Sequence, residues 1–315
     1  MGWAVGLGSA AFPKDCQENR MIKYLIILIV ALSCARPFTA EGAAGYGTAR
    51  SAAPVLNTPE IDAVFGSRDG RSLQTDRCGQ VRALEFIALP GTPFRLLAEV
   101  KRGENRVYRV ETDDYPVPAG TALYVDSRLI ERSSTPPPPR PRHLPAREEI
   151  IVTMKTALGS PYVWGGNLPQ GVPGMLGLYY RGQFPEQERE RLALAGLDCS
   201  GLLYWATNGW TPRNTSDLVA FGRGVAVAGR GAAELAAMLQ PLDLIVWNGH
   251  VVIVLDSETV IESRLECGRP GNGGVVATPL KQRIQEIMRN RRPADAWPEG
   301  KQRGMFVVRR WFGNS

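Results

Sequence analysis

The apolar positions of this chain change their period along the sequence. Residues 59–132 carry short alternating apolar runs, clearest at 94–100, 107–111 and 122–125, with a polar turn at 103–105. Alternation with a period of two is typical of strands that bury one face. We therefore expect a small all-β barrel over 59–132.

The C-terminal half shows helical patterns followed by strand patterns. A helix is predicted over 148–158, with acidic residues in its first turn and Gly159 at its end. Further helices are expected after Cys199, from Thr215, and over 232–239. Strands are predicted at 244–247, 250–255, 259–263 and 305–310. Helices followed by strands indicate an α+β domain over 146–315.

Residues 1–40 are expected to be a targeting segment. The apolar run 24–33 follows Arg20 and Lys23, and its ten residues suit the core of a signal peptide better than a membrane span. We expect the signal peptide to start at Met21. Lipidation of Cys34 and cleavage near Ala40 both stay open, and either implies export to the periplasm or cell envelope.

Two connecting segments differ in composition. Residues 41–58 are rich in Ala, Gly and Ser, which predicts a flexible spacer. Residues 133–145 form a linker with four consecutive prolines at 136–139, which favour stiff polyproline geometry. The linker is therefore predicted to act as a spacer between two domains.

The charge of the chain is concentrated near its C-terminus. From Lys281 onward there are nine basic and three acidic residues, which equals the whole formal charge of +6. A solvated basic segment is the simpler interpretation, and contact with an anionic surface such as cell wall or lipid headgroups is the functional one. Nucleic acid is not expected as a partner, because the basic residues are not interleaved with stacking aromatics.

The five cysteines form no regular framework: they are Cys16, Cys34, Cys78, Cys199 and Cys267. Their odd number, their wide spacing and the lack of a C-x-x-C pair indicate neither a disulfide scaffold nor a zinc site. No metal or organic cofactor is expected. Cys78 and Cys267 are expected to be ordinary thiols, and the sequence leaves a disulfide between them open.

Cys199 has the surroundings of a nucleophile. It stands in Asp-Cys-Ser-Gly-Leu (198–202) before a helical pattern, so that free backbone N–H groups and the helix dipole would favour a thiolate. A base must accompany it, and the chain holds two histidines. His143 lies in the proline-rich linker, whereas His250 heads an apolar strand. We therefore predict a catalytic pair of Cys199 and His250.

Four blocks around this pair resemble the NlpC family of cell-wall cysteine peptidases, in that family's order: GSPYVWGG (159–166), DCSGL (198–202), LQPLDLIVW (239–247) and GHVVI (249–253). The resemblance implies a papain-like fold and cleavage of peptidoglycan stem peptides, typically between D-γ-glutamate and the diamino acid. The end of the β segment, LYVDSRLI (123–130), resembles bacterial SH3-like domains, which would grip the wall or line the cleft. An amidase or acyltransferase and a non-catalytic wall-binding protein are the alternatives.

The resemblance also assigns further site residues. The family places a polar residue, most often His, on the strand after the histidine strand, and here Glu262 aligns with it. Ser263 and Asn272 are lesser candidates, and an exposed Glu262 is the structural alternative. Tyr162 would help to stabilise the oxyanion.

The neighbours of the nucleophile and one insert complete the expectations. Asp198 and Ser200 would position the peptide, with Asp198 attracting a free amino group or capping the helix. The segment 167–197 is longer than family members usually have. It either shapes the cleft or forms a surface excursion.

Overall fold

The computed structural model describes residues 45–313, except 68, 103–104, 118–119, 270–271, 299 and 301–303. The chain divides into two compact units, Met1–Ala40 and Glu41–Ser315. The predicted signal peptide, its start at Met21 and the cysteine Cys34 lie outside the described residues. Among the helices of the described part, none is both long and apolar enough to cross a bilayer.

The N-terminal part of the second unit is an antiparallel sheet of seven strands, in the order β5-β2-β8-β7-β6-β1-β9. The strands are β1 (Gly45–Ala49), β2 (Ala53–Leu56), β5 (Leu84–Ala88), β6 (Pro93–Arg102), β7 (Asn105–Glu111), β8 (Leu123–Asp126) and β9 (Ile130–Ser133). Between them lie α2 (Ile61–Val64), β3 (Phe65–Gly66), β4 (Ser72–Leu73) and the short 3-10 helix η1 (Ser127–Leu129). The strands predicted from alternation at 94–125 are confirmed.

The expectation of a flexible spacer at 41–58 is wrong for the described residues, because this segment contributes β1 and β2 to the sheet. Its small residues are used for close packing rather than for flexibility. Ala49 and Ala53 are buried, and a Cβ on Gly47 would lie 2.5 Å from a side-chain methyl of Ile130. Composition alone does not distinguish small residues in a linker from small residues under a neighbouring strand.

The C-terminal part contains a second sheet in the order β12-β18-β13-β14-β15-β16, with β17 pairing β18. Its strands are β12 (Arg223–Gly224), β13 (Leu244–Trp247), β14 (His250–Val254), β15 (Thr259–Leu265), β16 (Gly273–Pro279), β17 (Arg292–Ala294) and β18 (Met305–Arg310). Its helices are α3 (Arg147–Thr156), α6 (Cys199–Ala206), α7 (Thr215–Leu218), α8 (Ala232–Met238) and α9 (Leu280–Met288). A mixed fold of helices and sheets is confirmed, and β17 pairs in parallel with β18 in an otherwise antiparallel sheet.

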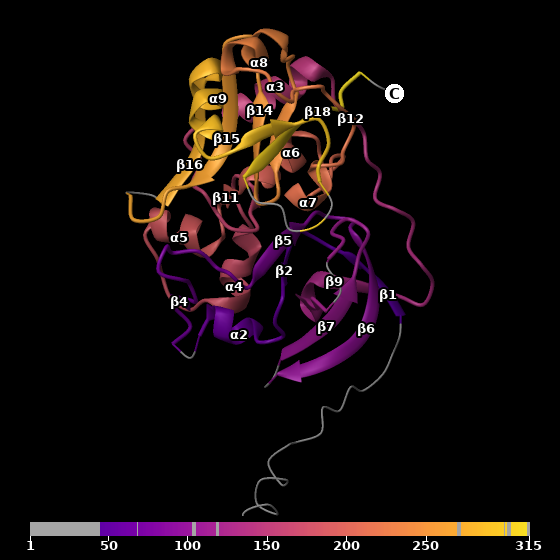
Figure 1. Ribbon diagram of the computed structural model, residues 1–315. Helices are drawn as coiled ribbons and strands as arrows, with labels where there is room; N and C mark the ends of the chain where they lie inside the picture. The colour runs from indigo at the N-terminus through magenta and orange to yellow at the C-terminus, as the bar shows by residue number, and fades with distance from the viewer. Residues whose placement is uncertain are drawn as a thin grey trace, which may run out of the picture. The chain divides into compact units, whose positions relative to one another are not determined.

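Helices cover both faces of this second sheet. Val251 and Ile253 pack with α3 and α6, whereas the alternate residues Val252 and Val254 pack with α8 and α9. Figure 1 shows α9 beside β15 and β16. The strand β16 is absent from the predicted elements, and α9 lies in the segment predicted to be basic and solvated. That interpretation is wrong for α9, which buries three apolar side chains: Leu280, Ile284 and Ile287.

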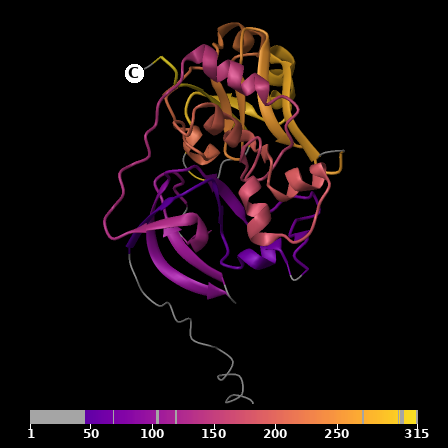
Figure 2. The ribbon, with the colours of Figure 1, turned by 180° about the vertical axis from the view of Figure 1, so that it is seen from behind.

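The insert 167–197 packs between the two sheets. It contains β10 (Asn167–Leu168), η2 (Pro173–Met175), α4 (Leu176–Tyr179), α5 (Glu186–Leu192) and β11 (Gly196–Leu197). Met175, Leu192 and Leu194 are buried in one cluster with Phe65 of the N-terminal part. Figure 2 shows its pink helices next to the indigo part of the chain. A surface excursion, one of the two interpretations left open, is therefore wrong.

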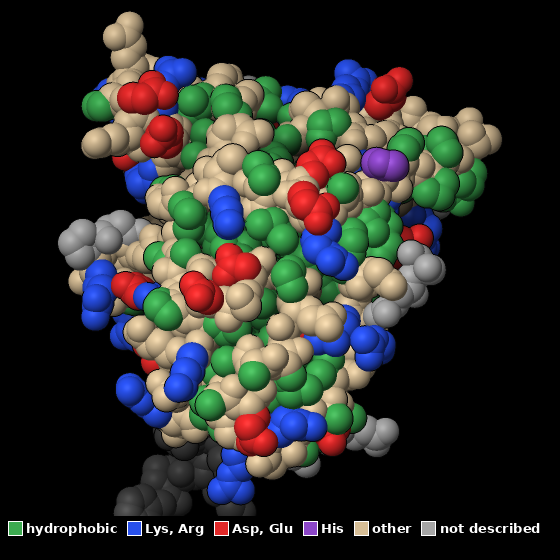
Figure 3. All heavy atoms as spheres, turned by 90° about the horizontal axis from the view of Figure 1, so that it is seen from above, with side chains coloured by type: hydrophobic (Ala, Val, Ile, Leu, Met, Phe, Trp, Pro, Cys, Tyr) green, Lys and Arg blue, Asp and Glu red, His purple; other side chains and the backbone are tan. Residues whose placement is uncertain are grey.

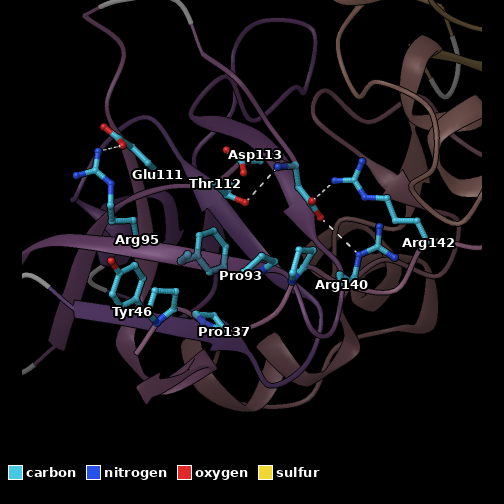
Figure 4. Close-up of a pocket in the computed structure, with 13 residues that line it drawn as sticks. Tyr46, Pro93, Arg95, Glu111, Thr112, Asp113, Pro137, Arg140 and Arg142 are labelled. Carbon is cyan, nitrogen blue, oxygen red and sulfur yellow. Dashed lines mark hydrogen bonds and ion pairs between the residues drawn. The ribbon is translucent and has the colours of Figure 1, made fainter. Parts of the chain in front are cut away.

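The proline-rich linker is fixed to both parts by Arg140. This side chain is 6% exposed, its Nε lies 3.5 Å from the Asp114 carboxylate, and it donates to the carbonyls of Asn208 and Gly209 after α6. Arg142 pairs with the same carboxylate. Figure 4 shows the two arginines at one end of a groove of about 300 Å³ between the linker and the first sheet. None of the residues that line this groove belongs to the Cys199 site.

A disulfide joins Cys78 to Cys267, with Cα atoms 5.1 Å apart across 189 residues of sequence. The expectation that these are ordinary thiols is wrong. The bond ties the loop after β4 to the loop that follows β15. Spacing along the chain could not show it, because the pairing depends on packing between two distant segments.

Candidate active site

Cys199 is the first residue of α6 and is 6% exposed. Asp198 caps the helix by accepting a hydrogen bond from the backbone N–H of Gly201 at 2.6 Å, which confirms the capping role. The free N–H groups and dipole of the first turn favour negative charge on the sulfur. The sequence therefore forms a helix whose start presents a thiol.

Gly201 allows α6 to approach the preceding loop. A Cβ at this position would lie 2.0 Å from the carbonyl oxygen of Gly166, so any larger residue would push the helix start away. The backbone N–H of Asp198 also donates to that carbonyl, at 2.9 Å. The loop that ends the GSPYVWGG block is thus held directly against the nucleophile helix.

Arg213 is a buried cation near the start of α6 and is absent from the site residues predicted from the sequence. Its side chain is 1% exposed, and its two terminal nitrogens bond the two oxygens of Asp198 at 2.6 and 3.0 Å. It also donates to the hydroxyl of Ser200 at 3.0 Å, and to groups on Asn167 and Gly166 at 3.3 Å. A lone arginine in Trp-Thr-Pro-Arg carries no sequence signal for such a role.

This pairing changes the roles expected of Asp198 and Ser200. The Asp198 carboxylate is fully engaged by Arg213, Gly201 and the Ser200 hydroxyl, so its charge is compensated and an attraction for a free amino group is not supported. Both residues are buried. They position the start of α6, and a direct contact of either with a peptide stays a prediction.

His250 begins β14 directly after a tight hairpin turn. Trp247 pairs with His250 across Asn248 and Gly249, and Gly249 has φ 105°, a left-handed conformation that suits glycine in such a turn. The backbone N–H of Gly249 donates to the Thr215 hydroxyl in α7 at 2.9 Å. The Trp247 ring lies 5.1 Å from the imidazole between centroids. The hairpin and the tryptophan together fix the imidazole.

His250 lies between Cys199 and Glu262. Its Nε2 is 2.6 Å from Oε2 of Glu262, which leaves Nδ1 for the Cys199 thiol within hydrogen-bonding reach. Burial alone would lower the pKa of His250, but its hydrogen bonds and charge interactions with Cys199 and Glu262 raise this pKa to about 9. The raised pKa favours the imidazolium form of His250, which suits a histidine that acts as proton donor beside a cysteine.

Glu262 is fully buried on β15, the strand paired with β14. Burial raises the pKa of its carboxyl, but hydrogen bonds from His250 and Arg283 outweigh it and leave the pKa below the usual range. The predicted reach between Glu262 and His250 is present, and the alternative of an exposed glutamate is wrong. Its role in catalysis stays a prediction.

The two lesser candidates for this position lie elsewhere. The Ser263 hydroxyl donates to the backbone carbonyl of Leu197 at 2.6 Å, on the opposite side of the strand, and so holds the segment before Cys199. Asn272 accepts from the backbone N–H of Gly268 at 3.3 Å in the loop that contains Cys267. In the described part of the chain, neither side chain forms a hydrogen bond with His250.

Tyr162 is close enough to Cys199 and Asp198 to interact with their charges. Burial raises the pKa of its phenol, and the negative charges of Asp198 and Cys199 raise it further, so the hydroxyl keeps its proton and can donate. Gln80 of the N-terminal part fixes this loop. It donates to the Tyr162 carbonyl at 3.4 Å and accepts from the Trp164 N–H at 2.9 Å. Gln80 is absent from the site residues predicted from the sequence.

The arrangement brings together the groups that nucleophilic chemistry uses. A cysteine at a helix start, an imidazole beside it and a carboxylate behind the imidazole are the parts of a cysteine–histidine–carboxylate triad. Within the described ranges, no cluster of three or more His, Cys, Asp or Glu side chains could hold a metal ion.

Comparison with known proteins gives fold neighbours only. No protein-family profile and no curated protein matches the sequence. An NlpC/P60 family protein from Bacillus cereus ATCC 10987 has 19% identity over 87% of this chain and 65% of its own, with a TM-score of 0.30. RipD from Mycobacterium tuberculosis is a non-catalytic NlpC/p60 domain protein adapted to peptidoglycan binding. It has 17% identity over 53% of this chain and 98% of its own, with a TM-score of 0.29. An NlpC/P60 endopeptidase from Photobacterium damselae subsp. piscicida has 11% identity over 81% of this chain and 70% of its own, with a TM-score of 0.40.

The chain thus spans just under two thirds of the Bacillus cereus protein. All three TM-scores lie below 0.5, so no activity or residue role is taken from these structures. The functional assignment depends on the geometry around Cys199.

Proposed function

We propose that this chain is a cysteine hydrolase that cleaves peptide stems of peptidoglycan, with Cys199 as nucleophile, His250 as acid and base, and Glu262 as the group that orients His250. The observation that carries the proposal is the meeting of these three side chains at the start of α6 and on β14 and β15. A wholly structural cysteine would not need a charged imidazole and a buried carboxylate beside it.

The geometry supports a two-step reaction. The Cys199 thiolate attacks the scissile carbonyl, and the His250 imidazolium gives its proton to the leaving amine, which leaves a thioester on the sulfur. A water molecule, deprotonated by His250, then attacks the thioester and releases the acid, which leaves Cys199 as thiolate and His250 as imidazolium, as at the start of the cycle. The backbone N–H of Cys199 and the Tyr162 hydroxyl would donate to the oxyanion in both steps.

The substrate class rests on the four sequence blocks that resemble NlpC peptidases. We propose a papain-like arrangement for the catalytic part and cleavage between D-γ-glutamate and the diamino acid. An SH3-like role is proposed for the first sheet, mainly as a wall beside the active-site loop, because Gln80 holds both Tyr162 and Trp164. Because of this contact, we favour a role in lining the active-site cleft over a role as a separate module that binds the cell wall.

Two alternatives differ in the bond that is cut or in whether any bond is cut. An amidase or acyltransferase would use the same thiolate and imidazole on another acyl bond. A non-catalytic wall-binding protein would have no need for the buried network of Cys199, His250 and Glu262. That network favours catalysis.

Export and surface attraction belong to the proposal as well. We propose a location in the periplasm or envelope, on the basis of the apolar run at 24–33. Attraction of the basic C-terminal segment to an anionic surface has weaker support, because Arg283 and Arg310 form ion pairs with Glu262 and Asp243. On the face in Figure 3, basic and acidic side chains are interspersed.

Mass spectrometry of defined muropeptides separates these options. We expect products cut between D-γ-glutamate and the diamino acid. Release of an intact stem from the glycan would indicate an amidase instead, and transfer to an added amine would indicate an acyltransferase. Binding to insoluble peptidoglycan with no product from any muropeptide would contradict a hydrolase.

A further inference from the structure

The carboxylate of Glu262 is approached by cations from several elements. His250 reaches it from β14, and Arg283 reaches it from α9 on the sheet face that α9 covers. Arg264, two residues further along β15, lies 3.7 Å from Oε1. Glu262 is fully buried, so these side chains, rather than water, solvate its charge.

Arg283 binds the same oxygen as His250. Its Nη2 donates to Oε2 at 2.8 Å, where His250 Nε2 lies at 2.6 Å, and its Nε lies 2.6 Å from Oε1. The guanidinium therefore spans both oxygens of the carboxylate. Its side chain is only 15% exposed, and Glu286 holds its outer nitrogen at 3.1 Å.

The helix beneath Arg283 keeps it in this place. Leu280, Ile284 and Ile287 are buried on one side of α9, and Arg283 precedes Ile284 on the edge of that side. With both the helix and Glu286 fixing the guanidinium, the carboxylate has little freedom to rotate away from the imidazole.

We infer that Arg283 is a positioning residue that holds the Glu262 carboxylate against His250 and shares its negative charge. The inference rests on the proposed function for its effect on turnover, although the charge sharing itself does not. The positive guanidinium partly neutralises the carboxylate, so the carboxylate stabilises the protonated imidazole less strongly. His250 can then release the proton to a leaving amine and recover it from water.

The other charges around the pair do not replace Arg283. Cys199 faces His250 from α6 and supports the imidazolium. Arg291 lies over the Trp247 ring, 4.4 Å from its centroid, and not on the carboxylate. Arg264 is engaged by Glu266 at 3.0 Å, closer than it is to Glu262.

The test is an NMR titration of His250 in the full chain. The protein has two histidines, and the exposed His143 gives a second imidazole signal that serves as an internal reference. Arg283→Met removes the charge and keeps an unbranched apolar side chain. Lys281→Met is the matched control, because Lys281 is an exposed cation of the same helix. Glu262→Gln removes the negative charge of the carboxylate instead of the positive charge of its partner.

We expect the pKa of His250 to rise by about one unit in Arg283→Met, because a charge at this distance shifts a pKa by roughly one to three units. It should fall in Glu262→Gln and stay unchanged in Lys281→Met. On muropeptides, Arg283→Met should lower kcat about fivefold to tenfold with KM within about twofold, and Arg283→Lys should recover part of kcat.

An unchanged or lowered pKa of His250 in folded Arg283→Met contradicts the inference. If that variant does not fold, the pKa of His250 in Arg283→Lys is the deciding measurement. A single ammonium bond in place of two guanidinium contacts predicts a smaller upward shift, and no shift contradicts the inference. The titration needs no substrate. Shifts as expected without any muropeptide cleavage would overturn the proposed function alone, whereas cleavage without the shifts would overturn only the role of Arg283.

Discussion

His250 Nε2 and Glu262 Oε2 lie 2.6 Å apart on adjacent strands, and the carboxylate is fully buried. The pairing of β14 with β15 places the two side chains on the same face of the sheet. A carboxylate in this position fixes the imidazole ring and stabilises the imidazolium that forms during proton transfer.

Glu262→Gln is therefore expected to lower kcat by about 100-fold while KM changes by less than about threefold, because the amide keeps the shape and loses the charge. Steady-state kinetics on a purified muropeptide measure both constants. Glu258→Gln is the control, since Glu258 is exposed in the turn before β15. An equal loss in both variants, or a loss confined to KM, would argue against an orienting role.

The raised pKa of His250 also predicts how stability depends on pH. Burial would lower this pKa, yet interactions with Cys199 and Glu262 raise it to about 9 from an ordinary value of 6.5. A raised folded-state pKa gives a contribution that is complete below pH 6.5 and is lost as pH rises through about 9. Urea unfolding should show that the stability advantage over His250→Gln shrinks across this window, on the order of 1–3 kcal/mol. An advantage that grows with pH would contradict the ion pair.

Arg213 should contribute strongly to stability, because removing one partner leaves the buried Asp198 charge uncompensated. We expect Arg213→Gln to lower the free energy of unfolding by about 3–5 kcal/mol. The double variant Arg213→Gln with Asp198→Asn should recover part of this loss, whereas Arg223→Gln, at an exposed position of β12, should change little. Denaturant titrations measure all three. No recovery in the double variant would mean that the loss has another cause.

The Cys78–Cys267 disulfide should stabilise the folded chain because it closes a loop of 189 residues in the unfolded state. Reduction is expected to lower the free energy of unfolding by about 3–5 kcal/mol. The double variant Cys78→Ser with Cys267→Ser should start at this lower value and show no further response to a dithiol reductant. Equal stability of the oxidised and reduced protein, with reduction verified by thiol counting, would refute this contribution.

Local patterns in the sequence predicted the parts of the site that each depend on one element. The helix after Cys199 and the strand from His250 have their own periodicity, whereas Glu262 is assigned only by the resemblance to NlpC peptidases. Tyr162 is likewise assigned by the resemblance of the 159–166 block. For this helix and this strand, the residues adjacent in the sequence determine the conformation.

Residues whose roles depend on distant contacts escaped prediction. Arg213 and Arg283 reach Asp198 and Glu262 across 15 and 21 residues, and nothing in the neighbours of Arg213 distinguishes it from a surface arginine. For Arg283, the spacing of apolar residues at 280, 284 and 287 was a usable signal, because it predicts a buried side of α9 next to the arginine. The disulfide and the packing of the 167–197 insert depend on how the two sheets meet.

The most direct test of the account is mass spectrometry of muropeptide digests by the unmodified protein, Cys199→Ala, and the double variant Cys78→Ser with Cys267→Ser. The account predicts cleavage products from the unmodified protein and from the double variant, and none from Cys199→Ala with its fold verified by circular dichroism. Undiminished cleavage by Cys199→Ala would contradict the assignment of Cys199 as nucleophile, and with it the proposed mechanism.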